Sequence, residues 1–198
     1  FRETDCSRAP IGDWRTNREK LPFGLEGAAQ SALSRSMAFG LWLEPEAVSP
    51  TSQLAQEHPD WILGACCGSS APVLGRHEWL LDLSQKAVQD HLINLLDGLL
   101  SDLPISYVKW DMNRPMANMP QGGHHGPLGY SLGLYRVLST VTQRHPDVLI
   151  EGCASGGNRL DAGMLAYVGQ NWASDNTDPF DRLRIQSGLA LCFPPEVL

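Results

Sequence analysis

Four short apolar segments of this sequence are each followed by an acidic residue, and this pattern constrains the fold more than any other feature. The segments span residues 38–43, 105–110, 148–150 and 170–174. The acidic residues after them are Glu44, Asp111, Glu151 and Asp175. Helical spacing of apolar residues is found at 24–37, 84–100, 132–141 and 179–191. Strands that alternate with helices in this way predict parallel βα units.

Two architectures share this order of elements, a doubly wound sheet and a barrel of parallel strands. A doubly wound dinucleotide fold carries a glycine-rich G-x-G-x-x-G turn after a strand, with an acidic residue about 20 positions later. The sequence has no such turn. We therefore predict an α/β chain that forms part of a (β/α)8 TIM barrel. Because the carboxyl ends of barrel strands meet at one face, the four acidic residues are expected to converge there.

The composition argues against several classes of partner. The net charge is −7 and the chain has only three lysines. We therefore expect no nucleic-acid partner, since phosphate binding needs clustered cations. No apolar run reaches the length of about 18 residues that a transmembrane helix needs, so no membrane partner is expected.

The five cysteines and a pair of adjacent histidines indicate free thiols and a loop rather than a metal site. Cys66 and Cys67 are sequence neighbours, which is a poor geometry for a disulfide, and no Cys-x-x-Cys pair is present. Together with the lack of a visible targeting segment, this favours a reducing, cytoplasmic location. His124 and His125 lie in a glycine-rich stretch that predicts a loop. We expect no metal and no cofactor.

Tryptophans lie close to three of the four acidic residues. Trp42, Trp110 and Trp172 each stand within three positions of a strand-end carboxylate. A sugar suits this combination, because its C–H face packs on an indole ring while its hydroxyls bind charged groups. The four carboxylates could instead hold a divalent metal, but no histidine stands at a strand end to complete such a site.

Glycoside hydrolysis needs two carboxyl groups, and the surroundings of Asp111 and Asp175 suit the two roles. Lys109 stands two positions before Asp111 in a largely apolar strand, where its ammonium needs a partner on the same face. Such a pairing would keep Asp111 ionised, as a nucleophile requires, although a purely structural ion pair is the alternative. Asp178 precedes Pro179 and is explained as a helix cap. Asp175 has no such explanation and is the better general acid.

At these positions the sequence resembles the retaining α-galactosidases of glycoside hydrolase family 36. The matching stretches, in the order of the family, are FGLWLEPE at 39–46, HPDW at 58–61, YVKWDMNR at 107–114, EGCASGGNR at 151–159 and WASDNTD at 172–178. The resemblance implies that Asp111 is the nucleophile that forms a covalent galactosyl-enzyme. It also implies that Asp175 is the acid that protonates the leaving oxygen and then the base that activates water.

The resemblance further implies a set of residues that bind the galactosyl group of an α-galactoside oligosaccharide. They are Trp42, Arg76, Lys109, Trp110, Met112, Asn113, Cys153, Gly156 and Trp172. For Cys153 the alternative is a small buried apolar residue at a strand end. The stretch GRHE at 75–78 departs from the family pattern after the arginine, and Pro115 replaces the residue expected after NR. The Asp-Asp-Gly-Trp motif, with which the family reads the 4- and 6-hydroxyls of the sugar, is absent.

The leading hypothesis is hydrolysis of terminal α-galactosyl residues, as in melibiose or raffinose-type oligosaccharides. An α-N-acetylgalactosaminidase and a galactosyltransferase of the raffinose-synthase kind would keep the same carboxylates. An inactive sugar-binding fragment is a further alternative. A complete barrel typically needs about 250 residues. We therefore expect residues 1–198 to be an incomplete catalytic barrel domain that holds roughly strands 3 to 6. Its parent, with flanking strands and accessory β domains, is expected to be a homo-oligomer.

Overall fold

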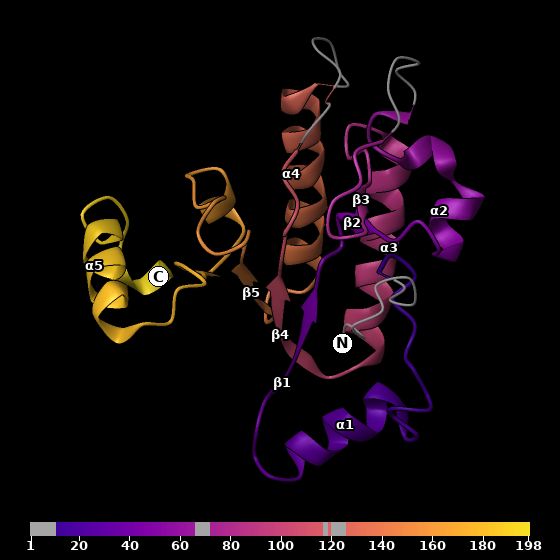
Figure 1. Cartoon of the computed structure of the whole chain (residues 1–198). Coiled ribbons are helices and arrows are strands. Elements are labelled where there is room, and N and C mark those ends of the chain that lie inside the picture. The colour runs from indigo at the N-terminus through magenta and orange to yellow at the C-terminus, as the bar shows by residue number, and fades with distance from the viewer. Residues whose placement is uncertain (1–10, 66–71, 117–118, 120–125) are drawn as a thin grey trace.

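The computed structural model describes residues 11–65, 72–116, 119 and 126–198 of the 198-residue chain. Its centre is a parallel sheet of four strands, β1 (Phe39–Leu43), β4 (Ile105–Trp110), β5 (Leu149–Gly152) and β6 (Gln170–Asn171), which neighbour one another in chain order (Figure 1). The parallel βα arrangement that the sequence predicts is therefore confirmed. All four strands run in the same direction, so their carboxyl ends lie at one edge of the sheet.

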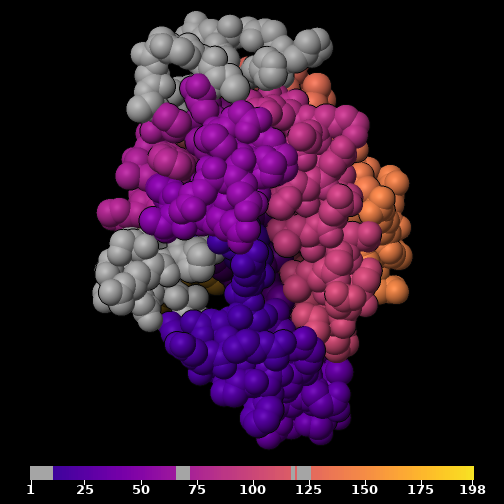
Figure 2. All heavy atoms as spheres, turned by 90° about the vertical axis from the view of Figure 1, so that its right-hand side faces the viewer, coloured from indigo at the N-terminus to yellow at the C-terminus, as the bar shows by residue number. Residues whose placement is uncertain are grey.

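Two long helices connect the central strands and pack against each other (Figure 1). They are α3 (Lys86–Asp102) between β1 and β4, and α4 (Pro127–Arg144) between β4 and β5. The shorter elements are α1 (Gly24–Leu33), α2 (Gln53–Glu57), α5 (Pro179–Leu189), η2 (Pro59–Trp61), η5 (Met164–Ala166), η6 (Pro195–Val197) and the antiparallel pair β2 (Ala47–Val48) and β3 (Trp79–Leu80). Figure 2 views the molecule from the side of α2 and α3, with the indigo N-terminal segment at its lower end.

The hydrophobic core fills the space between the sheet and the two long helices. The fully or nearly fully buried residues there include Val88, Leu92, Leu96, Val108, Leu134, Val137, Leu138 and Ile150. Each such side chain contributes about 1.5–3 kcal/mol relative to an exposed one. The helix α4 approaches the segment before α3 closely at Gly133, where an added Cβ would lie 1.8 Å from the carbonyl oxygen of Leu83. Only glycine fits at this contact.

The helix α3 begins at Lys86, after Gln85, rather than at residue 84, where the helical spacing in the sequence starts. The Ser84 hydroxyl donates to Asp82 Oδ1 at 2.6 Å. At the other end of the chain, Asp178 caps α5 as predicted, since its side chain accepts from the backbone N–H groups of Phe180 and Asp181.

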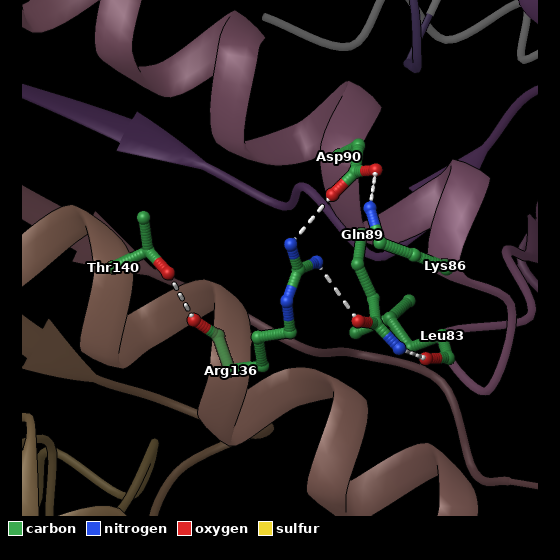
Figure 3. Close-up of polar contacts among 6 residues, drawn as sticks. All are labelled: Leu83, Lys86, Gln89, Asp90, Arg136 and Thr140. Atoms are coloured by element: carbon green, nitrogen blue, oxygen red, sulfur yellow. Dashed lines mark hydrogen bonds and ion pairs between the residues drawn. The ribbon is translucent and has the colours of Figure 1, made fainter.

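Polar side chains join the outer sides of α3 and α4 (Figure 3). Arg136 of α4 donates to Gln89 Oε1 at 3.0 Å and to Asp90 Oδ1 at 2.7 Å, and Lys86 also pairs with Asp90. Gln89 in turn donates to the carbonyl oxygen of Leu83 at 2.8 Å. These contacts connect the two helices to each other and to the segment before α3.

The C-terminal helix α5 lies apart from α3 and α4, beyond β5 and β6 (Figure 1). None of its residues is buried, and Phe180 and Leu183 are 76% and 65% exposed. Among the described residues, no helix is both long and apolar enough to cross a membrane.

Candidate active site

Parallel register places the residues of the candidate site side by side at the carboxyl edge of the sheet. Trp42 of β1, Lys109 of β4 and Glu151 of β5 are cross-strand partners in one row. Val108 and Trp110, which flank Lys109 in β4, are buried and point to the opposite face of the sheet, where the helices lie. Lys109 and Trp42 are partly exposed, with Trp42 at 42%. The row therefore lines the face of the sheet that the long helices do not cover.

Asp111 follows β4 directly, and neutral donors surround its carboxylate. Its Oδ2 accepts from Trp42 Nε1 at 3.0 Å, and its Oδ1 accepts from the backbone N–H of Met112 at 2.9 Å. Burial by itself would raise the pKa of this carboxyl group, but hydrogen bonds from Trp42, Asn113 and Cys153 outweigh it and lower the pKa. The group is therefore ionised at neutral pH, as a nucleophile must be.

Lys109 pairs with Glu151 and not with Asp111, so this part of the sequence prediction is wrong. Its Nζ lies 2.7 Å from Glu151 Oε1 and 4.3 Å from the ring centre of Trp172. Neighbouring strands are about 4.8 Å apart, whereas residues i and i+2 of one strand are about 6.6 Å apart. The cross-strand carboxylate is therefore the nearer partner. Glu151 also accepts from the Tyr107 hydroxyl.

Asn113 connects Asp111 to the strand ends on both sides. Its backbone N–H and its Nδ2 donate to the Glu44 carboxylate at 2.6 and 3.2 Å. Its Oδ1 accepts from the Ser155 hydroxyl at 3.1 Å. Burial raises the pKa of Glu44, and the negative charge of Asp111 raises it further. The hydrogen bonds from Asn113 lower it, but the net effect is a raised pKa. The negative charge of Asp111 is thus close enough to act on Glu44.

The glycine-rich turn after β5 begins at Cys153, whose backbone N–H donates to the carbonyl oxygen of Trp110 at the end of β4. Burial raises the pKa of its thiol to about 12, so the group remains a neutral donor toward Asp111. Three residues later, Gly156 has a φ of 87°, and an added Cβ would lie 3.0 Å from the backbone nitrogen of Asp175. Only glycine allows the turn to lie this close to the Asp175 segment.

Asp175 is exposed, in contrast to Asp111, and lies beside an indole ring. Its Oδ1 accepts from Trp172 Nε1 at 3.0 Å. The other charged contacts of this ring are Lys109 at 4.3 Å and the guanidinium of Arg182 at 4.8 Å from its centre. Trp172 thus links Asp175 to the row of residues on the sheet.

Arg76 stands at the tip of a tight hairpin. Gly75 and Glu78 exchange backbone hydrogen bonds, and Arg76 and His77 between them have φ values of 51° and 61°. Two successive left-handed residues form a type I′ turn, which costs strain for side chains other than glycine or asparagine. Burial raises the pKa of Glu44 and the positive charge of Arg76 partly offsets this rise, so Arg76 is close enough to act on Glu44.

Two of the predicted binding residues have no side chain on the open face. Trp110 is fully buried and donates from Nε1 to Glu46 Oε1 at 2.8 Å, on the helix side of the sheet. Met112 is 5% exposed and belongs to the hydrophobic core, so it reaches the site only through its backbone N–H. The structure gathers the other predicted residues, Trp42, Lys109, Asn113, Cys153, Gly156 and Trp172, around Asp111 and Asp175, with Arg76 close to Glu44.

The sequence analysis expects free thiols and a loop rather than a metal site, and the structure covers the residues concerned only in part. His124, His125, Cys66 and Cys67 lie outside the described residues. Cys153 and Cys192 are free thiols. Within the described ranges, no three His, Cys, Asp or Glu side chains are grouped as a metal ion would require.

Comparison with known proteins identifies the family. The sequence model named Melibiase matches residues 1–198. The chain belongs to the melibiase family. As a member of it, the chain is 44% identical to α-galactosidase AgaA of Geobacillus stearothermophilus, over 98% of this chain and 27% of that protein. It is also 44% identical to α-galactosidase C of Emericella nidulans, over 96% of this chain and 26% of that protein. The melibiase chain thus spans about a quarter of the length of these relatives.

Solved structures agree with this assignment. A variant of the GH36 α-galactosidase AgaA in complex with 1-deoxygalactonojirimycin matches with a TM-score of 0.90 and 44% identity, over 98% of this chain and 28% of that chain. Other AgaA variants, in complex with stachyose and with raffinose, match with TM-scores of 0.89 and 0.88. The resemblance to family 36 and the α/β fold of a partial barrel are therefore confirmed.

Three residues of this melibiase site were missed or given no role by sequence reasoning. Tyr107 stands two positions before Lys109 and therefore shares its face, a period-two signal that could have revealed it. Ser155 has a φ of 48° and donates to Asn113. The sequence reveals only that Ser155 lies in a glycine-rich turn and not that it contacts Asn113. Glu44 was placed at a strand end, but its two contacts with Asn113 depend on tertiary structure.

Proposed function

We propose that this chain forms the catalytic centre of a retaining α-galactosidase that hydrolyses terminal α-galactosyl residues of raffinose-type oligosaccharides. One observation carries the proposal. Asp111 is a buried carboxylate whose pKa is lowered by neutral donors, and Asp175 is an exposed carboxylate that an indole N–H orients. The two groups have the contrasting environments that a nucleophile and an acid/base need. The relatives named α-galactosidase, and the AgaA complexes with raffinose and stachyose, support galactose as the sugar.

The first step is attack of an Asp111 oxygen on the anomeric carbon. The bond between this carbon and the leaving oxygen breaks, and Asp175 transfers its proton to that oxygen. The rest of the substrate, now protonated on the leaving oxygen, departs as an alcohol. The product on the protein is a β-linked galactosyl ester of Asp111, because attack comes from the face opposite the leaving group.

The second step uses the same two residues in reverse roles. Asp175, now ionised, removes a proton from a water molecule that attacks the anomeric carbon. The ester bond to Asp111 breaks, galactose leaves with the α configuration, and both carboxyl groups return to their initial states. The donors around Asp111 help because they stabilise the carboxylate that leaves in this step.

Lys109, Trp42 and Trp172 form the sugar-binding surface in this proposal. The indole rings offer apolar faces to the C–H groups of the sugar, and the ammonium donates to its hydroxyls. Arg76 and Asn113 add further donors close to Glu44. Truncation of any of these sugar-binding side chains is therefore expected to raise KM more than it lowers kcat.

The test is hydrolysis of an aryl α-galactoside by the full-length protein and its variants. Asp111→Ala and Asp175→Ala are each expected to lower kcat by at least a thousandfold. Asp178→Ser is the matched control, because Asp178 lies three residues from Asp175 but caps α5, and it should keep wild-type rates. Wild-type rates from Asp111→Ala would overturn the proposal. Binding of galactose in calorimetry without any turnover would instead show a binding protein.

Azide and a second sugar sharpen the result. With Asp111→Ala, azide takes the place of the nucleophile and should give the β-galactosyl azide. With Asp175→Ala, azide attacks the galactosyl ester and should give the α-galactosyl azide. Faster hydrolysis of the aryl α-N-acetylgalactosaminide would show a different sugar specificity, and transfer to sucrose in preference to water would show a transferase.

A further inference from the structure

The segment that carries Asp175 is joined to the start of α5 by short-range hydrogen bonds. Asp178 caps the helix, and its own backbone N–H donates to Asn176 Oδ1 at 2.9 Å. Asn176 Nδ2 donates to Asp181 Oδ2, in the first turn, at 2.9 Å. The Asp175 side chain itself is exposed, so its orientation depends on further contacts.

Arg182 of α5 reaches back over this segment. Its Nη1 donates to the carbonyl oxygen of Ser174 at 2.7 Å, and its guanidinium carbon lies 4.8 Å from the ring centre of Trp172. One guanidinium group therefore contacts the residue directly before Asp175 and also the indole ring that donates to Asp175. A planar guanidinium suits both contacts at once, because it stacks on an aromatic ring while its N–H groups donate at its edge.

The hydrogen bond from Trp172 to Asp175 gives the position of the ring a chemical consequence. Trp172 Nε1 donates to Asp175 Oδ1 at 3.0 Å, so this oxygen acts as an acceptor. When the carboxyl group is protonated, the proton is therefore carried by Oδ2. In the proposed mechanism Oδ2 is then the oxygen that transfers the proton to the leaving group. Without the indole contact, the carboxyl group could rotate and either oxygen could carry the proton.

The indole ring of Trp172 depends on side chains for its position. Its backbone is fixed, since its N–H donates to the carbonyl oxygen of Gly152 at 2.9 Å, but its side chain is only partly buried. Lys109 and Arg182 both lie over the ring, at 4.3 and 4.8 Å from its centre. Lys109 is held by its ion pair with Glu151, whereas Arg182 belongs to the helix that follows the Asp175 segment. Arg182 thus couples the ring to that segment.

We propose that Arg182 is a positioning residue, which holds the Trp172 ring and the Ser174 backbone so that Asp175 presents one defined oxygen to the leaving group. The inference rests on the proposed function, because it concerns the acid/base of the same reaction. Arg182 acts through these two contacts and transfers no proton itself.

The experiment compares two substrates of the full-length protein that differ in their need for an acid. Phenolate is a poor leaving group, so cleavage of phenyl α-galactoside needs a proton from Asp175. Dinitrophenolate leaves without a proton, so the first step on the dinitrophenyl α-galactoside needs no acid. Methionine keeps an unbranched side chain but has no charge and no N–H donor. For Arg182→Met, kcat/KM should fall about tenfold or more with the phenyl substrate and less than about twofold with the dinitrophenyl substrate.

Azide gives an independent readout of the second step. In the wild-type protein Asp175 activates the water that attacks the galactosyl ester, so azide has little advantage over water. In Arg182→Met the base is less well oriented, and azide attacks the ester without needing a base. Azide should therefore raise kcat for the dinitrophenyl substrate and give the α-galactosyl azide. A role of Arg182 in stability alone would change neither the substrate dependence nor the response to azide.

Arg184→Met is the matched control. Arg184 lies on the same helix and is exposed. Residues two positions apart are separated by about 200° around a helix, so Arg184 lies on nearly the opposite side from Arg182. The control should keep wild-type rates with both substrates, and thermal unfolding of each variant separates loss of fold from loss of rate. If Arg182→Met does not fold, Arg182→Lys replaces it, because an ammonium keeps the charge but cannot stack and donate at once.

An equal loss with both substrates and no response to azide would overturn the positioning role, and so would wild-type rates with both. Either outcome differs from failure of the proposed function, in which the wild-type protein hydrolyses neither galactoside.

Discussion

Lys109 and Glu151 form an ion pair across two neighbouring strands, with 2.7 Å between Nζ and Oε1. The same ammonium lies 4.3 Å from the ring centre of Trp172, whose indole N–H donates to Asp175. Lys109 thus stands between a structural carboxylate and the segment that carries the proposed acid/base. The position of Lys109, and with it the proposed contact with a sugar hydroxyl, depends on Glu151.

We predict that Glu151→Gln weakens substrate binding. The glutamine can still accept from Tyr107, but it no longer holds the Lys109 ammonium. KM for an aryl α-galactoside should rise about tenfold, which corresponds to about 1.4 kcal/mol, while kcat changes less. The control is Asp90→Asn, which removes a carboxylate that pairs with Lys86 and Arg136 on the outer side of α3. An unchanged KM for Glu151→Gln would contradict this prediction.

The strands and the strand-end carboxylates could be predicted because both depend on local sequence. Apolar runs mark β1, β4 and β5, and the direction of parallel strands then places Glu44, Asp111 and Glu151 at one edge. The partner of Lys109 could not be predicted in this way. Its choice depends on the register between β4 and β5, which sequence periodicity does not contain.

Contacts between distant segments were also beyond the sequence. The resemblance to family 36 assigned Trp110 to the sugar pocket, but Trp110 directly precedes Asp111, and successive residues of a strand point to opposite faces. Its actual partner, Glu46, lies 64 residues earlier in the chain. The contact of Arg159 with Glu46 spans 113 residues. Only the assembled fold brings these groups together.

The hydrogen bond from Trp42 to Asp111 predicts a change in pH dependence. Burial raises the pKa of Asp111, and the indole N–H is foremost among the donors that lower it. Trp42→Phe keeps the ring but removes this donor, so the pKa of Asp111 should rise. The acid limb of the kcat/KM profile should then move to higher pH, with a several-fold additional loss of activity at acidic pH. Trp14→Phe, which alters the ring that packs on Trp42, is the control and should leave the limb in place.

The buried Glu46 carboxylate predicts a large stability effect. It accepts from Trp110, Tyr130 and Arg159, and it is completely buried. Glu46→Ala leaves the Arg159 guanidinium without its partner, and the free energy of unfolding should fall by about 3–5 kcal/mol. Urea unfolding measures the change.

Glu26→Ala is the comparison for Glu46→Ala. It removes an exposed partner of Arg18 at 3.6 Å, and the midpoint of unfolding should not move. A loss for Glu46→Ala no larger than for Glu26→Ala would show that the Glu46 cluster does not stabilise the fold.

His91 predicts that the fold loses stability in mild acid. It lies on α3, 5.4 Å from the ring of Trp61, which stacks at 3.8 Å on His58. Burial lowers the pKa of His91, and the nearby His58 adds to this effect. The unfolded chain, with a histidine pKa of about 6.5, therefore binds the proton more readily than the folded protein. Stability from this group is complete above that value and decreases as the pH falls below it.

The melting temperature measured between pH 8 and pH 5 tests this sign. The wild-type protein should lose more of its melting temperature toward pH 5 than His91→Gln, because glutamine has no proton to gain. His77→Gln is the matched control, since His77 is exposed at the tip of a hairpin, and its pH profile should follow the wild type. A parallel decline for His91→Gln and the wild type would assign the acid sensitivity to other groups, because the half-buried His91 imidazole would then contribute nothing to it.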